Sequence, residues 1–351
     1  MKDVVAKRIK AARTLAGLSL RELSEKLDNI VSYNAISKYE KEEMMPDSKV
    51  LIAMARALNV KPDYFFRPFT VEIDHIEFRK KSKLGVKKVN SIKEDVNDQL
   101  ARYIEIEQFL NISSDFKNPI LQFKIANGAD VENAVNHLLS IWKLGFNALP
   151  NVIELLEDHE VKVIELDATL EFDGLSGWAN GKIPLIVINK NFDIQRKRFT
   201  AFHELGHLLL QFQEGLEQKQ IEKLCHRFAG AMLMPQETFI NELGKARQQI
   251  VIPELVAIKE TFGISIQAIM ARAKDLGIIS DDRYISFRIW INKSDDHKKE
   301  IGLGSYQGKE QSNRFKQLIY RAAAEDVISM SKAANLANQT LAAFRDEFIA
   351  V

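Results

Sequence analysis

The feature that most constrains this chain is the pentapeptide His203-Glu204-Leu205-Gly206-His207. Two histidines four residues apart lie on one face of an α-helix, so both imidazoles can bind the same metal ion. Glu204 would then lie beside the open coordination position, where a carboxylate can accept a proton from water. This helix is predicted to be buried, because its flanking positions are apolar: Phe199, Phe202, Leu205, Leu208 and Leu209.

A catalytic zinc site usually has three protein ligands, so a third side chain is required. Cys225 is the single cysteine, and histidines and carboxylates must therefore supply the ligand. We expect Glu222, because it begins a helix whose other members are apolar, and a carboxylate along that face needs a partner. Glu214, Glu217 and His226 are the alternatives. The expected ion is Zn²⁺, although histidine and carboxylate ligands also accept manganese and other divalent ions.

His226 lies one turn beyond Glu222 on the same predicted helix face. There it would support the ligands, contact the transition state or replace Glu222 as a ligand. The alternative is a partly buried, hydrogen-bonded structural histidine. The remaining histidines are expected to be structural or exposed: His75, His137, His159 and His297.

Residues 131–279 resemble the ImmA/IrrE family of zinc metallopeptidases. The resemblance rests on residues 199–210, on Glu222 with Cys225 and Phe228-Ala229 after it, and on Leu233-Met234-Pro235. It implies a zinc endopeptidase of HExxH type that cleaves a transcriptional repressor, with His203, His207 and Glu222 as metal ligands and Glu204 as the general base. Residues 183–189, upstream of the motif, are a candidate edge strand to which an extended substrate adds, with an ordinary sheet strand as the alternative.

The first 90 residues carry 19 Lys/Arg against 12 Asp/Glu, a net charge of +7, whereas the whole chain carries +1. This asymmetry predicts an anion-binding front part joined to a mildly acidic body. Most of the excess lies in six residues that form either a solvated linker or a phosphate-contacting arm: Arg79, Lys80, Lys81, Lys83, Lys87 and Lys88.

Residues 6–66 are predicted to form short helices with tight connections, because apolar residues recur three and four positions apart. Ser19 with Glu22 forms a capping-box pattern, and Ser32 is a simple N-cap candidate. Successive helices over 8–16, 19–27 and 32–39 fit a helix-turn-helix, in which the second helix of the pair enters the major groove of DNA.

Residues 4–66 resemble the Xre/Cro-like repressor domain, through segments 18–23, 35–40 and 55–60 and Pro46. The resemblance implies a structural pair of Arg13 with Glu40. It also implies that five residues face a double-stranded DNA operator: Ser32, Tyr33, Asn34, Ser37 and Lys38. Asn34 would read a base edge and Lys38 would contact a phosphate. One such domain makes few phosphate contacts, so we expect a homodimer or a helping basic arm; a helical module for protein contact is the alternative.

The fold class predicted is α+β and mainly helical: an N-terminal all-α helix-turn-helix domain, then a zincin-like metallopeptidase domain with a small sheet and an active-site helix. A long helix over 86–110 carries an apolar stripe that is either a dimer seam or packed on its own domain. Strands are expected over 120–125, 161–166, 183–188 and 284–292, and helices over 131–144, 151–159, 195–210, 222–232, 253–262 and 265–276. The expected domains are 1–68 (helix-turn-helix), 69–116 (basic linker and connecting helix), 117–280 (metallopeptidase) and 281–351 (role unknown).

Two further features bear on location. No apolar stretch approaches the roughly 18 to 20 residues that a membrane-spanning helix needs, and the charged start has no apolar export segment. We therefore expect a cytoplasmic protein without a membrane partner.

Together these features predict a DNA-binding transcriptional regulator with zinc endopeptidase activity. Its substrate would be a repressor or antitoxin protein in a stress-response, mobile-element or toxin-antitoxin system. The alternative is a DNA-binding regulator whose metallopeptidase domain senses a signal or binds a partner with little proteolysis.

Overall fold

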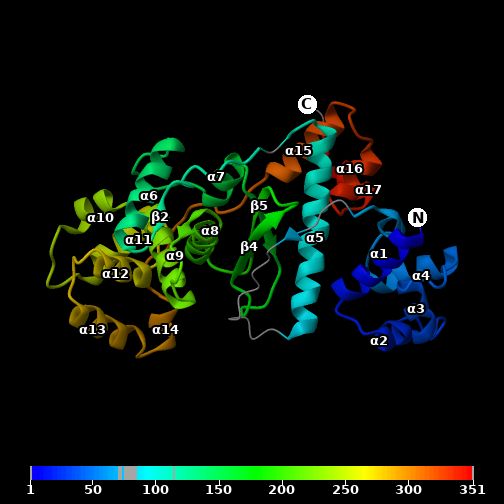
Figure 1. Ribbon diagram of the computed structural model, residues 1–351, viewed down its shortest axis with the longest axis horizontal. Coiled ribbons are helices and arrows are strands. Elements are labelled where there is room, and N and C mark those ends of the chain that lie inside the picture. Colours follow the sequence, from blue (N-terminus) through cyan, green and yellow to red (C-terminus); the bar gives the residue numbers. More distant parts are fainter. Residues whose placement is uncertain (1, 70–72, 75–84, 114, 350–351) are drawn as a thin grey trace. The chain divides into compact units, whose positions relative to one another are not determined.

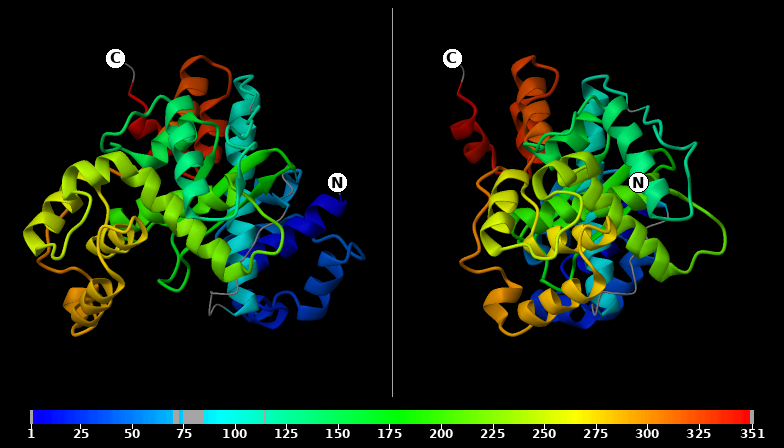
Figure 2. Two further views of the ribbon diagram at one scale, coloured as in Figure 1. Left: turned by 60° about the vertical axis from the view of Figure 1, so that its left-hand side comes forward. Right: turned by 90° about the vertical axis from the view of Figure 1, so that its left-hand side faces the viewer.

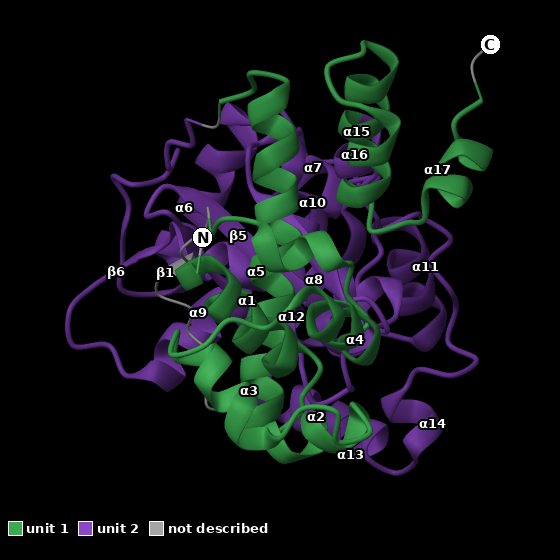
Figure 3. Ribbon diagram, turned by 90° about the vertical axis from the view of Figure 1, so that its right-hand side faces the viewer, with its two compact units in different colours: residues 1–74, 78–113, 318–351 green, residues 75–77, 114–317 purple. Residues whose placement is uncertain are grey.

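The computed structural model describes residues 2–69, 73–74, 85–113 and 115–349. The chain forms two compact units (Figure 3). Unit 1 contains residues 1–74, 78–113 and 318–351, and unit 2 contains residues 75–77 and 114–317. Unit 2 is therefore an insertion between two segments that fold together in unit 1.

Unit 1 begins with a bundle of short helices: α1 (Lys2–Leu15), α2 (Leu20–Lys26), α3 (Tyr33–Glu40), α4 (Ser48–Leu58) and the 3₁₀ helix η1 (Pro62–Phe66), which precede the two-residue strand β1 (Ile73–Asp74) (Figure 1). Ser19 and Ser32 cap α2 and α3 as predicted, and Ser19 forms the full capping box with Glu22. The bundle core is apolar and nearly free of solvent: Ile9, Leu23, Ile36, Met54 and Phe65 are all 0% exposed.

An ion pair joins the first helix to the third. The Arg13 guanidinium donates two hydrogen bonds to the Glu40 carboxylate, at 2.6 and 2.7 Å, which confirms the predicted pair. The turn between α2 and α3 lacks a glycine, and Asp28 and Asn29 take its left-handed backbone conformations instead, with φ of 52° and 56°. Aspartate and asparagine tolerate this region because their short side chains can hydrogen-bond locally.

Three more parts complete unit 1: α5 (Val86–Phe109), the paired helices α16 (Met330–Leu336) and α17 (Leu341–Glu347), and the end of α15 (Arg314–Ala324). Helix α5 packs against α1 and α16. Its apolar stripe is buried by these contacts within the chain, so the alternative of a dimer seam is wrong: Ile92, Val96, Leu100, Tyr103 and Ile104 are at most 7% exposed.

The compact units group the chain differently from the four domains expected from its sequence. Residues 281–317 belong to unit 2 and residues 318–351 to unit 1. The reason is that α16 packs on α5, whereas α13 packs on α12. The expected domain limits remain a prediction. In the division into compact units, the connecting helix α5 belongs with the N-terminal bundle.

Unit 2 contains a small sheet in which β5 (Ile183–Asn189) lies between β4 (Gly174–Ala179), antiparallel, and β3 (Lys162–Leu166), parallel. Two short strands, β2 (Lys124–Ile125) and β6 (Gln211–Phe212), pair in parallel elsewhere in the unit. The helices are α6 (Gly128–Ile141), α7 (Val152–Asp158), α8 (Ile194–Leu209), α9 (Gln218–Leu233), α10 (Gln236–Leu243), α11 (Ile252–Phe262), α12 (Ile266–Asp275), α13 (Asp281–Ile291) and α14 (Asp295–Lys298).

Three predictions about strands need correction. Residues 183–189 are not an edge strand, because both edges of β5 are paired and all seven of its residues are buried. Residues 284–291 lie in α13, and Asn292 is its C-cap, so residues 284–292 are not a strand. Of residues 120–125, only the last two form a strand. Strand β4, which begins at Gly174, was not predicted.

Helices α8 and α9 form the centre of the core of unit 2 and place the candidate metal site. They pack along much of their length, and α8 also covers β4 and β5 (Figures 1 and 2). Gly206 permits this close approach, because a Cβ atom there would lie 3.2 Å from the Phe228 ring and 3.5 Å from the Cys225 Cα. Phe202, Leu205 and Phe228 fill the interface and are fully buried.

Within the described part of the chain, no helix combines the length and the apolar character that crossing a membrane requires.

Candidate metal centre and DNA-contacting helix

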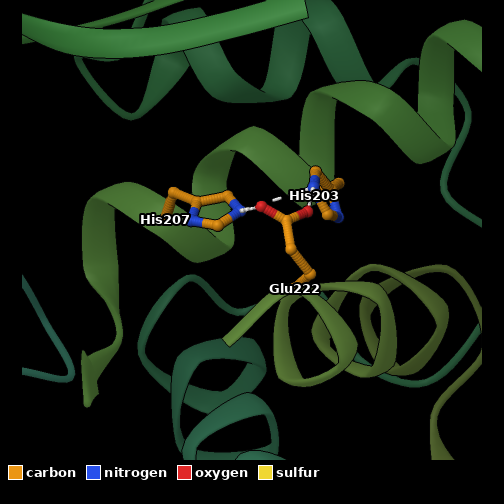
Figure 4. A group of neighbouring side chains, drawn as sticks. All are labelled: His203, His207 and Glu222. Carbon is orange, nitrogen blue, oxygen red and sulfur yellow. Dashed lines mark hydrogen bonds and ion pairs between the residues drawn. The ribbon is translucent and has the colours of Figure 1, made fainter. Parts of the chain in front are cut away.

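Three potential metal ligands lie together where α8 meets α9. His203 and His207 project from successive turns of α8, and the Glu222 carboxylate points at both imidazoles from α9 (Figure 4). Their Nε2 atoms are 3.4 Å apart, and the carboxylate oxygens lie 3.4 Å from His203 Nε2 and 4.0 Å from His207 Nε2. These side chains are only 9 to 12% exposed.

The donor set fits a small divalent cation. Tetrahedral zinc sites have bonds of about 2.0 to 2.2 Å, which place neighbouring donor atoms roughly 3.4 Å apart. The three donor atoms lie within 4.8 Å of one another. Among the described residues, they form a group of histidine and carboxylate side chains that could hold a metal ion. Glu214 and Glu217 are not in it, and Glu217 instead precedes α9 in a capping box with Gln220.

Glu204 lies on the same helix but faces the sheet. It is 3% exposed, and the Ser176 hydroxyl of β4 donates a 2.8 Å hydrogen bond to its Oε2 atom. Gly174 makes room for this arrangement, since a Cβ atom there would lie 2.8 Å from Thr200 and 3.4 Å from the Glu204 Cγ. Sequence reasoning missed Ser176, because a strand residue 28 positions from its partner leaves no local signal.

His226 lies next to the three-residue group and outside it. Its Nδ1 atom is 2.7 Å from the Glu222 carbonyl oxygen, which can only accept, so Nδ1 carries the proton. Its ring meets the His203 ring edge-on, with centroids 4.4 Å apart, and also contacts Phe199. His226 is exposed and not partly buried, and it contacts both the Glu222 backbone and the ring of His203.

The predicted DNA-contacting residues lie on or just before α3, and they differ in exposure. Tyr33 is 42% exposed, and Asn34 and Lys38 are also exposed, whereas Ser37 is half-buried. The Ser32 hydroxyl accepts a hydrogen bond from the Ala35 N–H and is therefore used as a helix cap.

Sequence reasoning also missed a neighbour of Tyr33. The Arg21 guanidinium of α2 lies over the Tyr33 ring, 5.4 Å from its centroid, and adds a cation beside α3. Of the six residues of the basic run, Lys87 forms an ion pair with Glu22 and Lys88 is exposed. The other four, in residues 79–83, lie outside the described residues.

Two family models match this chain. The model of the IrrE N-terminal-like domain matches residues 156–274, and a helix-turn-helix model matches residues 9–65. The HTH-type transcriptional regulator ImmR of Bacillus subtilis (strain 168) is 28% identical to this chain over 95 residues, which are 27% of the chain and 69% of that regulator. Both resemblances and the mainly helical α+β fold class are confirmed. The first match contains α8 and α9, and so places the candidate metal centre in a domain of metallopeptidase type.

Proposed function

We propose that this chain, which joins a helix-turn-helix domain to an IrrE N-terminal-like domain of metallopeptidase type, is a DNA-binding transcriptional regulator with zinc-dependent endopeptidase activity. Its substrate is a repressor or antitoxin protein, as expected for a stress-response, mobile-element or toxin-antitoxin system. The observation that carries the proposal is the meeting of His203, His207 and Glu222 beside a buried Glu204 that a serine holds in place.

The proposed roles follow from the positions of the side chains. His203, His207 and Glu222 would hold zinc, which supplies Lewis acidity that polarises a carbonyl and lowers the pKa of water. Glu204 accepts a proton from water and passes it to the leaving amine. Ser176 orients the Glu204 carboxylate. His226 steadies Glu222 through its carbonyl and limits the access of water to His203.

The DNA-binding half of the proposal rests on α3. Asn34 presents an amide that can form a bidentate contact with an adenine edge, and Lys38 presents a charge for a phosphate. Ser32, Tyr33 and Ser37 lie on the same short helix or cap it, and we include them in the interface. A double-stranded operator is the expected partner, and a homodimer would double the number of phosphate contacts.

The enzyme half is tested by measuring metal content and proteolysis on the same samples. Wild-type protein should contain about one zinc per chain by elemental analysis and should cleave the repressor encoded beside it. Glu222→Ala should lose most of the zinc and the cleavage. Glu204→Gln should keep the zinc but cleave about 10²- to 10⁴-fold more slowly, because only the base is lost.

Glu237→Ala, at an exposed position of α10, is the matched control and should behave as wild type. Cleavage by Glu204→Gln at the wild-type rate would contradict the proposed base. Zinc binding by wild-type protein without any cleavage would favour a regulator whose metal domain acts as a sensor or a partner-binding module.

A further inference from the structure

A groove of about 770 Å³ lies in unit 2. Phe199 of α8 and His226 of α9 line it, and the His226 ring contacts the ring of His203, so the groove is one side chain away from the candidate metal centre. Residues of α12, α13 and α14 also line it; these elements are labelled in Figure 1. Its volume is within the range of about 300 to 1,000 Å³ that is usual for ligand sites.

The wall of this groove carries an excess of exposed positive charge. Four basic side chains that line it are exposed: Arg196, Arg288, Lys298 and Lys299. Arg196 forms a surface ion pair with Asp173, and Lys298 forms one with Asp295 at 3.0 Å. The four side chains come from α8, α13 and the end of α14, so they do not belong to one element. This distribution suits several negative charges spaced along an extended chain better than a single phosphate group.

The acidic residues of the wall offset this charge only in part. The Asp193 carboxylate caps α8 and accepts a hydrogen bond from the Arg196 N–H. Glu300 is buried and paired with Lys259 at 3.0 Å. Asp275 is the remaining acid, so the residues that line the groove include three acids against seven basic side chains.

A second set of lining basic side chains forms internal ion pairs. Arg272 and Arg227 both bind the buried carboxylate of Glu132, at 3.0 and 2.9 Å. Because their charge is already paired, the exposed basic side chains are the ones that a ligand can meet.

We propose that this groove binds an acidic segment of the polypeptide substrate and delivers the neighbouring peptide bond to the metal centre. The inference rests on the proposed function, because it assigns a substrate class to that site. A peptide with glutamate or aspartate at several positions on one side of the scissile bond is the chemical class that the exposed cations fit.

The test measures binding of a fluorescein-labelled (Glu-Gly)₅ peptide to the full chain carrying Glu204→Gln, by fluorescence anisotropy. A (Gln-Gly)₅ peptide is the uncharged probe. In the same background, the double substitution Arg288→Glu with Lys299→Glu should weaken binding of the acidic peptide at least 10-fold. Lys182→Glu with Lys245→Glu changes the net charge equally at exposed positions outside the groove, and should change affinity less than 2-fold.

An equal loss of affinity for the acidic peptide in both double variants would overturn the proposal, because it would show a response to net charge only. Equal affinity of the protein for the two peptides would also overturn it. Circular dichroism and zinc content of each variant exclude misfolding as a cause of lost binding. A labelled 20-nucleotide single-stranded DNA is the alternative ligand. If the Arg288/Lys299 variant lost affinity for this DNA but kept its affinity for the peptide, the groove would be assigned to nucleic acid.

The failure of this inference is distinguishable from that of the proposed function. Selective binding of (Glu-Gly)₅ by a chain that cleaves nothing would support the groove and contradict the endopeptidase. Zinc-dependent cleavage of the repressor with the same KM in wild type and in the Arg288/Lys299 variant would support the endopeptidase and overturn the groove.

Discussion

Ser176 contributes one hydroxyl to the candidate centre. It donates a hydrogen bond to the Glu204 Oε2 atom, and removing it takes away one of the contacts that orient this carboxylate. Ser176→Ala should lower kcat for repressor cleavage about 10- to 100-fold, the usual effect of removing a group that orients a site residue. Zinc content and KM should not change.

The exposed Ser140 of α6 provides the matched control, and Ser140→Ala should retain full activity. An unchanged kcat in Ser176→Ala would show that the hydrogen bond is not needed to orient Glu204.

His159 makes stability depend on pH. Its ring stacks on Trp142, with centroids 4.2 Å apart, and burial lowers the pKa of the imidazole below the ordinary value of 6.5. As pH falls through 6.5, the unfolded chain therefore binds a proton at this site before the folded chain does, and the free energy of unfolding should fall. His159→Phe keeps the stacking but cannot titrate, so it should reduce this loss.

Urea unfolding followed by tryptophan fluorescence, between pH 5.5 and 7.5, checks this prediction. Above pH 7 the two proteins should show the same pH dependence. Identical slopes below pH 6.5 would contradict the role assigned to His159.

Residues close in sequence were the ones that could be predicted. The spacing of His203 and His207 places both side chains on one helix face wherever the helix lies. Glu222 could be predicted because a carboxylate on an apolar helix face needs a partner. Ser176 and Arg21 could not be found in this way, since their contacts depend on how a strand meets α8 and how α2 meets α3.

At the scale of elements, α5 packs inside its own unit and its buried stripe should determine stability. Leu100 is 0% exposed, and Leu100→Ala should lower the free energy of unfolding by about 2 to 5 kcal/mol. Val86, on the same helix, is 77% exposed, and Val86→Ala should change it by less than about 1 kcal/mol. Chemical denaturation followed by circular dichroism checks both values; equal, small effects would place the stripe outside the core.

Helices with strong local signals could be predicted from the sequence, and α13 could not. Its residues 284–292 alternate in polarity, but Ile285 and Ile289 are 54% and 60% exposed. The helix forms because Ser280 caps it, acidic residues occupy its first turn, and Phe287 and Ile291, four positions apart, are buried together. Strand β4 escaped prediction for a different reason, since its two glycines weaken the strand signal.

At the scale of the whole molecule, unit 1 joins segments from the two ends of the described chain. Lys61 of the helix-turn-helix bundle donates from Nζ to the carbonyl oxygens of Ala334 and Gln339, at 3.3 and 2.7 Å. Arg102 of α5 donates to the carbonyl oxygen of Leu336 at 2.9 Å. Both cations thus lie at the C-terminal end of α16, where the helix dipole favours positive charge.

Lys61→Ala combined with Arg102→Ala should release this end of the chain. Hydrogen bonds from charged groups contribute about 1.5 to 3 kcal/mol each, so amide exchange over residues 330–347 should rise at least 10-fold. Hydrogen-deuterium exchange followed by mass spectrometry measures it. Lys26→Ala with Lys41→Ala, at exposed positions of the same bundle, should leave exchange there unchanged. Unchanged exchange in the Lys61/Arg102 variant would contradict the role of these contacts.

The insertion of unit 2 also imposes an order on synthesis. Residues 2–66 have a core of their own and can fold as soon as they leave the ribosome. The carbonyl groups that Lys61 and Arg102 bind follow only after residues 114–317 have been translated. At roughly 5 to 20 residues per second, that interval lasts on the order of 10 to 40 s. Throughout it, the nascent chain carries the helix-turn-helix bundle and α5 without α16 and α17.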